Sequence, residues 1–342
     1  MDSPPDRPPV ERLTDLVKEG DRDEAVACLE RFETASADGR KAALGALRSL
    51  ADERPVALEP LTPTLRTFLA DDDRAVRLRT AKLFVALAEA TPDAVVPVAP
   101  ALAERLADPD ELYFVRARAA ETLGYVALEH PESVASPEVL ADLRIGLSFD
   151  EPEVKEKLAK ALEHVAIGNP GRLEHHVSNV AEHLGDESEL VRYHLSTALV
   201  VVGCEHPDAL AEARTRLGER LDDENAHVRG RAAEALGLLA RLESESESES
   251  EEPPIPEPEL RALADDEQFV AERARFAASA LGGDEGPDSG RFDGVGTVGA
   301  IRATTDEIVA ELTTADSDEC PNCGLALPEE SPPMCPRCGA AY

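Results

Sequence analysis

Four cysteines near the C-terminal end have the spacing of a metal site. The stretch from Glu319 to Gly339 reads ECPNCGLALPEESPPMCPRCG, and its cysteines are Cys320, Cys323, Cys335 and Cys338. Two thiolates in one Cys-x-x-Cys turn can reach a single ion, and a second such turn completes a tetrahedron with bonds of about 2.3 Å. Because four thiolates leave no coordination position for water, we expect one structural Zn²⁺ and no catalysis at the metal.

The two halves of this quartet share the sequence Cys-Pro-x-Cys-Gly. Proline pre-sets the turn, and the glycine permits the positive φ that swings backbone amides toward sulfur. The arrangement resembles a zinc ribbon, and we assign it to residues 318–342. A module this short is expected to fold only with its ion. An iron–sulfur, redox or metal-free quartet is the alternative.

A repeated helical unit organises most of the remaining chain. The segment VRGRAAEALGLLA starts at Val228, and the same register returns at intervals of 37 to 42 residues. The origins of the units are Gly39, Val76, Val115, Val154, Val191, Val228 and Val270. A fixed period in this range indicates a helical solenoid. Counted from each origin, positions +4 or +5, +8 and +11 are small or apolar, which places them on one stripe of a helix.

Proline marks the end of each repeated helix. It stands at position +16 in five successive units, at Pro55, Pro92, Pro131, Pro170 and Pro207. Proline suits the first turn of a helix, where its missing N–H has no partner to lose. Each unit therefore predicts a helix B from the origin, a turn at the proline, and helix A of the next unit. We expect A helices at 59–70, 95–107, 137–147, 173–184, 209–221 and 257–264, after two short helices at 10–18 and 22–31.

This pattern resembles HEAT repeats, in particular the HEAT-like repeats of phycobilisome lyases, over about residues 21–281. Val228-Arg229, Ala232-Ala233 and Leu236-Gly237 carry the resemblance most fully, together with the acidic turn before them. It implies an all-α fold, a right-handed α-solenoid of about six to seven helical hairpins. It also implies a ladder in which a turn Asp pairs with the Arg that opens helix B.

The ladder positions can be read from the register. They are Asp71, Arg77, Asp110, Arg116, Asp186, Arg192, Asp223 and Arg229, with Lys155 replacing one arginine and Asp265 in the last turn. Position +1 lies close to the apolar stripe, so a charge there is partly buried and needs a partner. We therefore interpret the ladder as structural, not catalytic.

Position +3 of helix B carries a second row of basic residues. Its members are Arg79, Arg118, Lys157, His194, Arg231 and Arg273. The row points away from helix A, and in HEAT-type solenoids the B helices line the concave surface. The neighbouring position +10 adds apolar side chains such as Tyr125. We interpret this strip as a groove for a protein partner, with preference for an acidic segment. Internal pairing with neighbours such as Glu121 and Glu234 is the alternative.

The charge of the chain limits its partners and its environment. Its 342 residues carry a formal net charge of −35, from 70 acidic and 35 basic residues. This composition resembles that of haloarchaeal proteins, which work in a very salty cytoplasm; a mesophilic acidic adaptor is the alternative. At about 1 M salt the Debye length falls to about 3 Å, which screens self-repulsion. Nucleic acid is disfavoured as a partner because phosphate binding needs clustered positive charge.

The remaining segments complete the predicted domain organisation. We expect a disordered N-terminus at 1–9, the solenoid at 10–282 with an acidic disordered loop at 243–256, a linker at 283–317, and the zinc ribbon. The linker contains an amphipathic helix at 297–313 with Ile301, Ile308 and Leu312 on one face. This helix either docks on the last repeat or binds a partner. Without a secretory or membrane-spanning apolar segment, we expect a cytoplasmic protein with no membrane contact.

These features favour a non-enzymatic scaffold or adaptor that binds a protein partner along the solenoid, with the zinc ribbon as a second contact. The sequence has no nucleophile elbow, phosphate-binding loop or His-Glu pair, so we expect no enzyme and no small-molecule substrate. One alternative is a nucleic-acid-associated factor of transcription or translation that uses the ribbon, although only Arg337 is basic after Cys320. A HEAT-like lyase-type enzyme is a third interpretation, and it rests on fold analogy alone.

Overall fold

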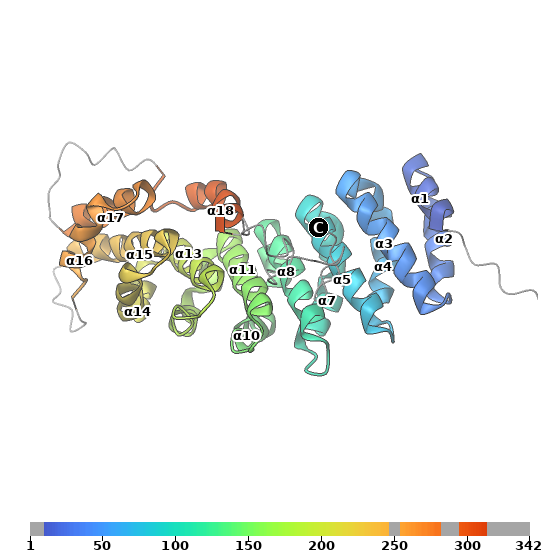
Figure 1. The fold of residues 1–342 in the computed structure, drawn as a ribbon, viewed down its shortest axis with the longest axis horizontal. Coiled ribbons are helices and arrows are strands. Elements are labelled where there is room, and N and C mark those ends of the chain that lie inside the picture. Colours follow the sequence, from blue (N-terminus) through green and yellow to red (C-terminus); the bar gives the residue numbers. More distant parts are fainter. Residues whose placement is uncertain (1–9, 246–253, 282–293, 313–342) are drawn as a thin grey trace, which may run out of the picture. The chain divides into compact units, whose positions relative to one another are not determined.

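The computed structural model describes residues 10–245, 254–281 and 294–312, and every regular element in these ranges is a helix (Figure 1). The described chain divides into two compact units. Unit 1 contains residues 10–149 and 160–169, and unit 2 contains 150–159 and the described residues from 170 onward. Helix α11 (Pro152–Gly168) contributes its first half to unit 2 and its second half to unit 1.

The B helices start two residues before the predicted origins, and polar side chains cap most of them. Ser36 accepts a hydrogen bond from the Gly39 amide, and Asp73 accepts one from the Ala75 amide. Such caps satisfy amides that the first helical turn leaves without partners. The B helices are α3 (Ala37–Glu53), α5 (Arg74–Ala90), α8 (Tyr113–Glu129), α11, α13 (Glu189–Glu205), α15 (Ala226–Glu245) and α17 (Gln268–Leu281).

The repeated proline ends the B helices for a steric reason. Residue Thr91, before Pro92, has φ −144° and ψ 67°, and His206, before Pro207, has φ −129° and ψ 64°. The proline ring clashes with a preceding residue in the helical region, so that residue leaves the helix. The chain then turns directly into the A arm of the next repeat.

The A arms are less regular than the continuous helices that we expected, because they alternate between α and 3-10 turns. Additional prolines such as Pro60 and Pro97 lack the N–H that an uninterrupted α-helix needs. The α segments are α4 (Thr62–Leu65), α6 (Pro92–Val95), α7 (Ala99–Ala107), α9 (Pro131–Val134), α10 (Pro137–Gly146), α12 (Val177–Ala181), α14 (Arg214–Glu219) and α16 (Glu257–Ala262). The 3-10 segments are Pro55–Leu61, Arg66–Ala70, Val96–Val98, Pro170–Arg172, Glu174–His176, Pro207–Ala213, Arg220–Asp222 and Leu263–Asp265.

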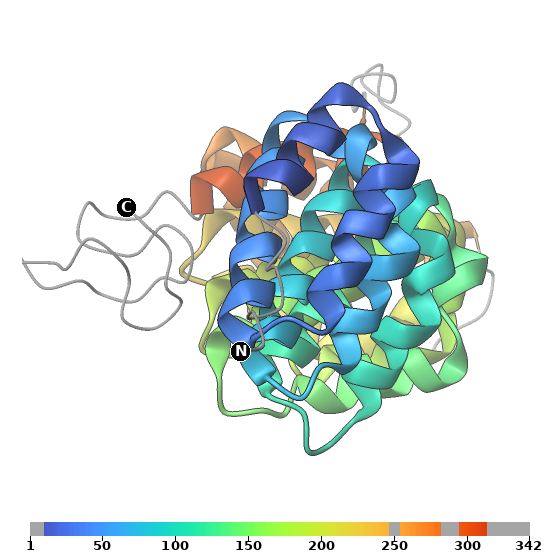
Figure 2. The same ribbon diagram turned by 90° about the vertical axis from the view of Figure 1, so that its right-hand side faces the viewer.

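In unit 1, the apolar stripe of each B helix forms the core against the A arms. Ala81, Phe84 and Leu87 of α5 have no exposed surface. Helices α1 (Val10–Glu19) and α2 (Arg22–Glu33) pack beside α3 at the N-terminal end of the unit (Figure 2). The core is therefore built mainly from Leu, Val and Ala, as the low aromatic content requires.

In unit 2, helices α13, α15 and α17 pack side by side. Gly237 of α15 allows a close approach to α17, since a Cβ there would lie 2.9 Å from the Ala277 Cα and 2.7 Å from the Phe276 ring. The last described helix, α18 (Val298–Leu312), contacts α13 and lies over the B helices of this unit (Figure 1).

Several sequence predictions fall beyond the described residues. The N-terminal segment 1–9, the zinc ribbon 318–342 and all four of its cysteines lie outside them. Part of the predicted acidic loop at 243–256 is described, and there α15 continues to Glu245 while Ile255 is buried. No helix within the described ranges is both long and apolar enough to cross a membrane.

Candidate partner-binding face

A ladder of ion pairs joins successive repeats and fixes the B helices in place. In each rung, the cation at position +1 binds a carboxylate in the turn of the following repeat. The nitrogen–oxygen distances are 2.7 Å for Arg40–Asp71, 2.7 Å for Arg77–Glu111, 2.6 Å for Lys155–Asp186, 2.8 Å for Arg192–Asp223 and 2.9 Å for Arg229–Asp266.

Each ladder arginine also holds its own turn through backbone carbonyls. Arg77 donates to the Asp71 carbonyl at 2.7 Å, and Arg229 donates to the Asp223 carbonyl at 2.8 Å. The hydrogen bond from Arg229 lowers the pKa of Asp266. One guanidinium therefore connects two consecutive turns, which is a structural role.

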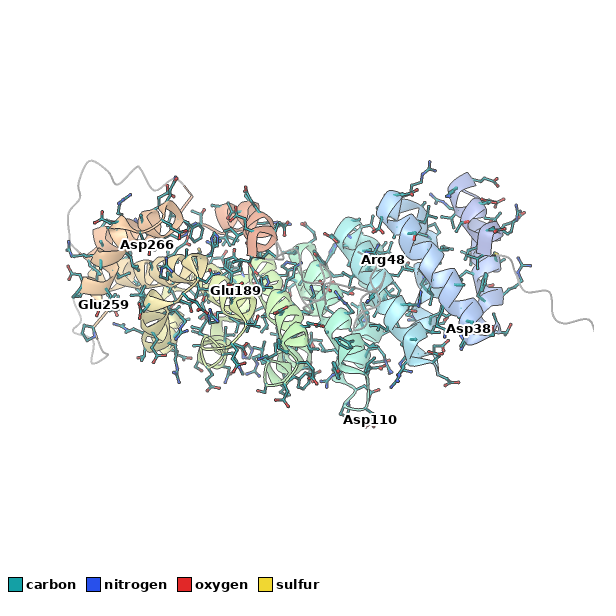
Figure 3. All side chains as sticks on the ribbon, in the orientation of Figure 1. Asp38, Arg48, Asp110, Glu189, Glu259 and Asp266 are labelled. Atoms are coloured by element: carbon teal, nitrogen blue, oxygen red, sulfur yellow. The ribbon has the colours of Figure 1, made fainter. Side chains whose placement is uncertain are left out.

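Three predicted members of the ladder do not take part in it. Asp110 is exposed in the turn before α8 (Figure 3), and the buried Glu111 is the acceptor instead. In the last turn the acceptor is Asp266, not Asp265 (Figure 3). Both acceptors lie four residues before the origin, whereas the other turns place theirs five residues before it.

Arg116 is the third exception. The following turn carries Phe149 at the position where other turns carry a carboxylate. Arg116 stacks over the Phe149 ring at 4.7 Å and donates through Nε to the Leu106 carbonyl at 2.8 Å. A cation–π contact and a carbonyl thus replace the ion pair at this rung.

In unit 2, three of the four members of the basic row at position +3 are buried and cannot contact a partner directly. Arg231 has no exposed surface, and His194 and Arg273 are also buried. The carboxylate of Glu234 accepts hydrogen bonds from Arg231 and from Arg273, both at 2.9 Å. The prediction of a solvent-facing groove is therefore wrong for these three residues, and Arg231 and Arg273 pair internally with Glu234 instead.

Aromatic rings complete the burial of this charged cluster. The Arg273 guanidinium lies 3.4 Å from the centroid of the Phe269 ring, and the Arg231 guanidinium lies 5.5 Å from it. Burial alone would raise the pKa of Glu234, but the charges of both arginines more than offset that effect, so its pKa lies below the ordinary value. Glu234 is thus ionised at neutral pH and binds two cations.

In unit 1, the same row remains partly accessible. Arg79 is exposed, donates to the Lys41 carbonyl at 3.5 Å, and lies against Gly45, where a Cβ would come within 3.2 Å of its guanidinium. Arg118 is half-buried and pairs with Glu121 at 2.6 Å. In this row, Arg79 is therefore accessible to solvent, whereas Arg118 pairs with Glu121 of its own helix.

Tyr125, at position +10 of α8, contacts a lysine of α11 in unit 1. Lys160 donates to the Tyr125 hydroxyl at 2.7 Å, and its ammonium lies 4.6 Å from the centroid of the ring. Lys157, in unit 2, is half-buried. Tyr125 of α8 and Lys160 of α11 therefore form one cation–aromatic pair.

Sequence reasoning missed three side chains that extend this surface. Leu78 and Lys82 of α5 and Phe114 of α8 are all half-buried. They occupy positions +2, +6 and −1, so the repeat register would have identified them had all outward positions been compared. We define the unit 1 face by Leu78, Arg79, Lys82, Phe114 and Tyr125.

The described residues also bear on metal and thiol chemistry. Within the described ranges, no group of three or more His, Cys, Asp or Glu residues could hold a metal ion. Cys28 is buried, and burial together with Glu234 raises the pKa of the half-buried Cys204 to about 12. The Cys204 thiol is therefore not activated for reaction at neutral pH.

Comparison with known proteins identifies the class of the fold. No family model matches the chain, and no curated protein matches it. An engineered protein solved by the Northeast Structural Genomics Consortium aligns with a TM-score of 0.65 at 19% identity, covering 78% of this chain and 71% of that one. A second engineered protein from the same consortium aligns with a TM-score of 0.55 at 21% identity, covering 65% and 99%.

A designed armadillo repeat protein is similar to the same extent. Its TM-score is 0.54 at 21% identity, and the alignment covers 64% of this chain and 99% of the designed one. Identities this low show the fold alone. The described chain is therefore a helical-repeat solenoid, which agrees with its sequence period and its inter-repeat ladder.

Proposed function

We propose that the protein is a non-enzymatic adaptor that binds an acidic segment of a protein partner on the unit 1 face. The observation that carries the proposal is the exposure of Arg79 beside Lys82 and Leu78, in a chain of net charge −35. A strongly acidic protein keeps most of its surface negative, so an accessible basic and apolar strip indicates a site that selects acidic groups.

The chemistry of this face suits a helix or extended segment with alternating apolar and acidic residues. Leu78 and Phe114 are half-buried and offer part of their apolar surface, and the aromatic ring of Tyr125 adds to it. Burial of these groups supplies the affinity, and Arg79 and Lys82 supply the selection for carboxylates. The apolar part keeps the interaction effective in high salt, which screens exposed charge pairs.

We further propose that the repeats are HEAT-like and that Cys320, Cys323, Cys335 and Cys338 bind one structural Zn²⁺. The spacing of the two Cys-Pro-x-Cys-Gly turns supports this assignment. The zinc module would make a second contact with the partner. Two weak sites on one chain gain through effective concentration, so neither has to bind tightly alone.

Affinity purification of the tagged full chain and of a variant without residues 318–342, in about 2 M KCl, tests the adaptor role. We expect a protein to be recovered with both forms and in a smaller amount with the truncated one. Recovery of nucleic acid that depends on residues 318–342 would favour the nucleic-acid-associated alternative. Recovery of neither a protein nor nucleic acid would contradict the adaptor role.

A further inference from the structure

Helix α18 packs on the B helices of unit 2 as an amphipathic ligand would. Ile301, Thr305 and Ile308 lie on one side of the helix and are at most 6% exposed. The opposite side carries Asp306 and Glu307, which are exposed. The buried positions follow the spacing i, i+4, i+7, which is how a single helix fills a groove between other helices.

The receiving surface comes from three successive repeats. Tyr193 of α13, Val228 of α15 and Ile308 of α18 form one buried cluster, and Phe269 of α17 packs against it. The side chains of Val309 and Leu312 also pack on this cluster. We call the surface made by Tyr193, His227, Val228 and Phe269 the unit 2 face. It is mainly apolar and aromatic, and side chains of three B helices form it.

Polar contacts hold both ends of α18 to the same surface. At its start, the Gly296 amide donates to Glu234 at 2.7 Å. Gly296 has φ +72°, and a Cβ there would lie 3.0 Å from the Phe276 ring, so only glycine fits this entry. At its end, Glu311 lies 3.3 Å from the ring nitrogen of His227.

The charges beneath α18 favour an acidic occupant. Arg231 and Arg273 provide two cations, whereas Glu234 provides one carboxylate, so the buried cluster has a positive excess. His227 adds a further donor at the surface, and its present partner is the carboxylate of Glu311. A helix with an acid near its C-terminal end is therefore complementary to this face.

From this geometry we propose that the unit 2 face is a helix-binding site, that α18 is its resident occupant, and that an acidic amphipathic helix of a protein partner binds there by exchange with α18. Exchange is feasible because α18 has only 15 residues and is marginal as an isolated helix. Its main advantage is its covalent tether, which raises its effective concentration to the millimolar range. A partner helix has to overcome that advantage and replace the contacts that α18 makes with the face.

A partner helix is a better occupant than a second copy of this chain. Each copy carries a net charge of −35, so two whole copies repel one another more than a copy repels a short acidic helix. The site also differs from the unit 1 face in every residue that forms it. The proposed adaptor role explains what the exchange would be used for, but the binding equilibrium at the unit 2 face does not depend on it. Substitutions of Arg79 or Lys82 in the unit 1 face should therefore leave peptide binding to the unit 2 face unchanged.

Direct binding of a labelled peptide with the sequence of residues 294–312 tests this proposal on the full chain. Ile308→Asp in the protein weakens docking of its own α18 and leaves the receiving face unchanged. Ala303→Asp places the same charge on the exposed side of α18 and is the matched control. We expect the peptide to bind the I308D protein roughly tenfold or more tightly than the wild-type or A303D protein, because the tethered helix competes in those two.

Further variants define which outcomes contradict the proposal. Adding Phe269→Asp to I308D should abolish peptide binding, and a peptide with Glu311→Lys should bind I308D several-fold more weakly than the native peptide. Circular dichroism must show that the helical content of the I308D protein is kept, and a milder Ile308→Ala variant serves if it is not. The proposal would be overturned if the peptide bound neither the I308D nor the I308A protein. It would also be overturned if the peptide bound these variants no more tightly than it binds the wild type. Dimers that form through α18, detected by light scattering and lost in I308D, would overturn it in favour of exchange between copies.

Discussion

Arg192 of one repeat binds Asp223 of the next with a nitrogen–oxygen distance of 2.8 Å, and both side chains are almost completely buried. The same guanidinium donates to the carbonyls of Asp186 and Glu187 in its own turn, at 2.9 and 3.1 Å. Desolvation alone would lower the pKa of Arg192, but Asp223 more than offsets it, so the pKa is raised. The side chain of Arg192 thus fixes the positions of two consecutive turns relative to each other.

The first prediction concerns this rung. Arg192→Met should lower the free energy of unfolding by about 3 kcal/mol, because it leaves a buried carboxylate without its main partner. Arg220 still contacts Asp223 at 3.2 Å, which keeps the loss at the lower end of the range for buried pairs. Urea unfolding at constant salt measures the effect.

The control for the ladder variant is Arg216→Met. Arg216 forms an exposed pair with Glu219, so its loss should cost less than about 1 kcal/mol. Equal destabilisation by the two substitutions would show that the rung contributes no more than a surface pair.

The second prediction concerns the metal. The purified chain should contain one Zn²⁺, and Cys335→Ser should remove it, since three thiolates bind the ion more weakly than four. Metal analysis by mass spectrometry measures the stoichiometry. Cys204→Ser is the control because this thiol, with its pKa raised to about 12, is not a metal ligand at neutral pH. Zinc that remains in C335S would refute the assignment.

The third prediction concerns pH. Burial, the largest influence, lowers the pKa of His227 below its ordinary value of 6.5, and Arg231 and Arg273 act in the same direction. Glu311 opposes them. In the window below pH 6.5 the unfolded chain binds a proton that the folded chain does not, so stability falls as the pH falls through this window. Above pH 6.5 the contribution is fully present.

His227→Gln isolates this contribution. The difference in the urea midpoint between wild type and H227Q should shrink or change sign between pH 7 and pH 5, because only the wild type loses stability through His227. A difference that stays constant over this range would mean that the folded and unfolded pKa values of His227 are equal.

The fourth prediction concerns salt. With a net charge of −35, the compact state should gain thermal stability as KCl rises from about 0.1 M to about 2 M, because screening reduces self-repulsion. Scanning calorimetry measures the rise in Tm. The rise in Tm of the wild type should exceed that of a variant in which several exposed acids, such as Asp72 and Asp110, are replaced by the corresponding amides. A Tm that is independent of salt would contradict the interpretation of the composition.

Much of the fold could be predicted from the sequence because it depends on local rules. The stripe that contains Phe84 and Leu87 is set by helical periodicity, and the break at Thr91 is set by the following proline. A partner for Arg192 and Arg229 follows from the need to neutralise a charge beside the core, although each arginine pairs with the turn of the following repeat and not with the Asp of its own turn. These features require only the register of one repeat and its neighbour.

The state of the outward positions could not be predicted in the same way. Arg79 and Arg231 occupy the same register position, yet one is exposed and the other has no exposed surface. The difference comes from Tyr193 and Phe269 on adjacent helices and from α18, which is distant in sequence. Single-residue shifts in the turns likewise moved the acceptors from Asp110 to Glu111 and from Asp265 to Asp266. Long-range packing decides these details, and a repeat pattern does not encode it.

The most direct test of the account is quantitative affinity capture with the double variant Arg79→Glu/Lys82→Glu, in salt that keeps the chain folded. Its control is Arg66→Glu/Arg74→Glu, which makes the same change in net charge at two exposed arginines outside the unit 1 face. We predict that the partner protein is captured by the wild type and by R66E/R74E, and that R79E/K82E loses most of it while keeping its helical content. Equal capture by both double variants would contradict the assignment of the unit 1 face as the partner-binding site.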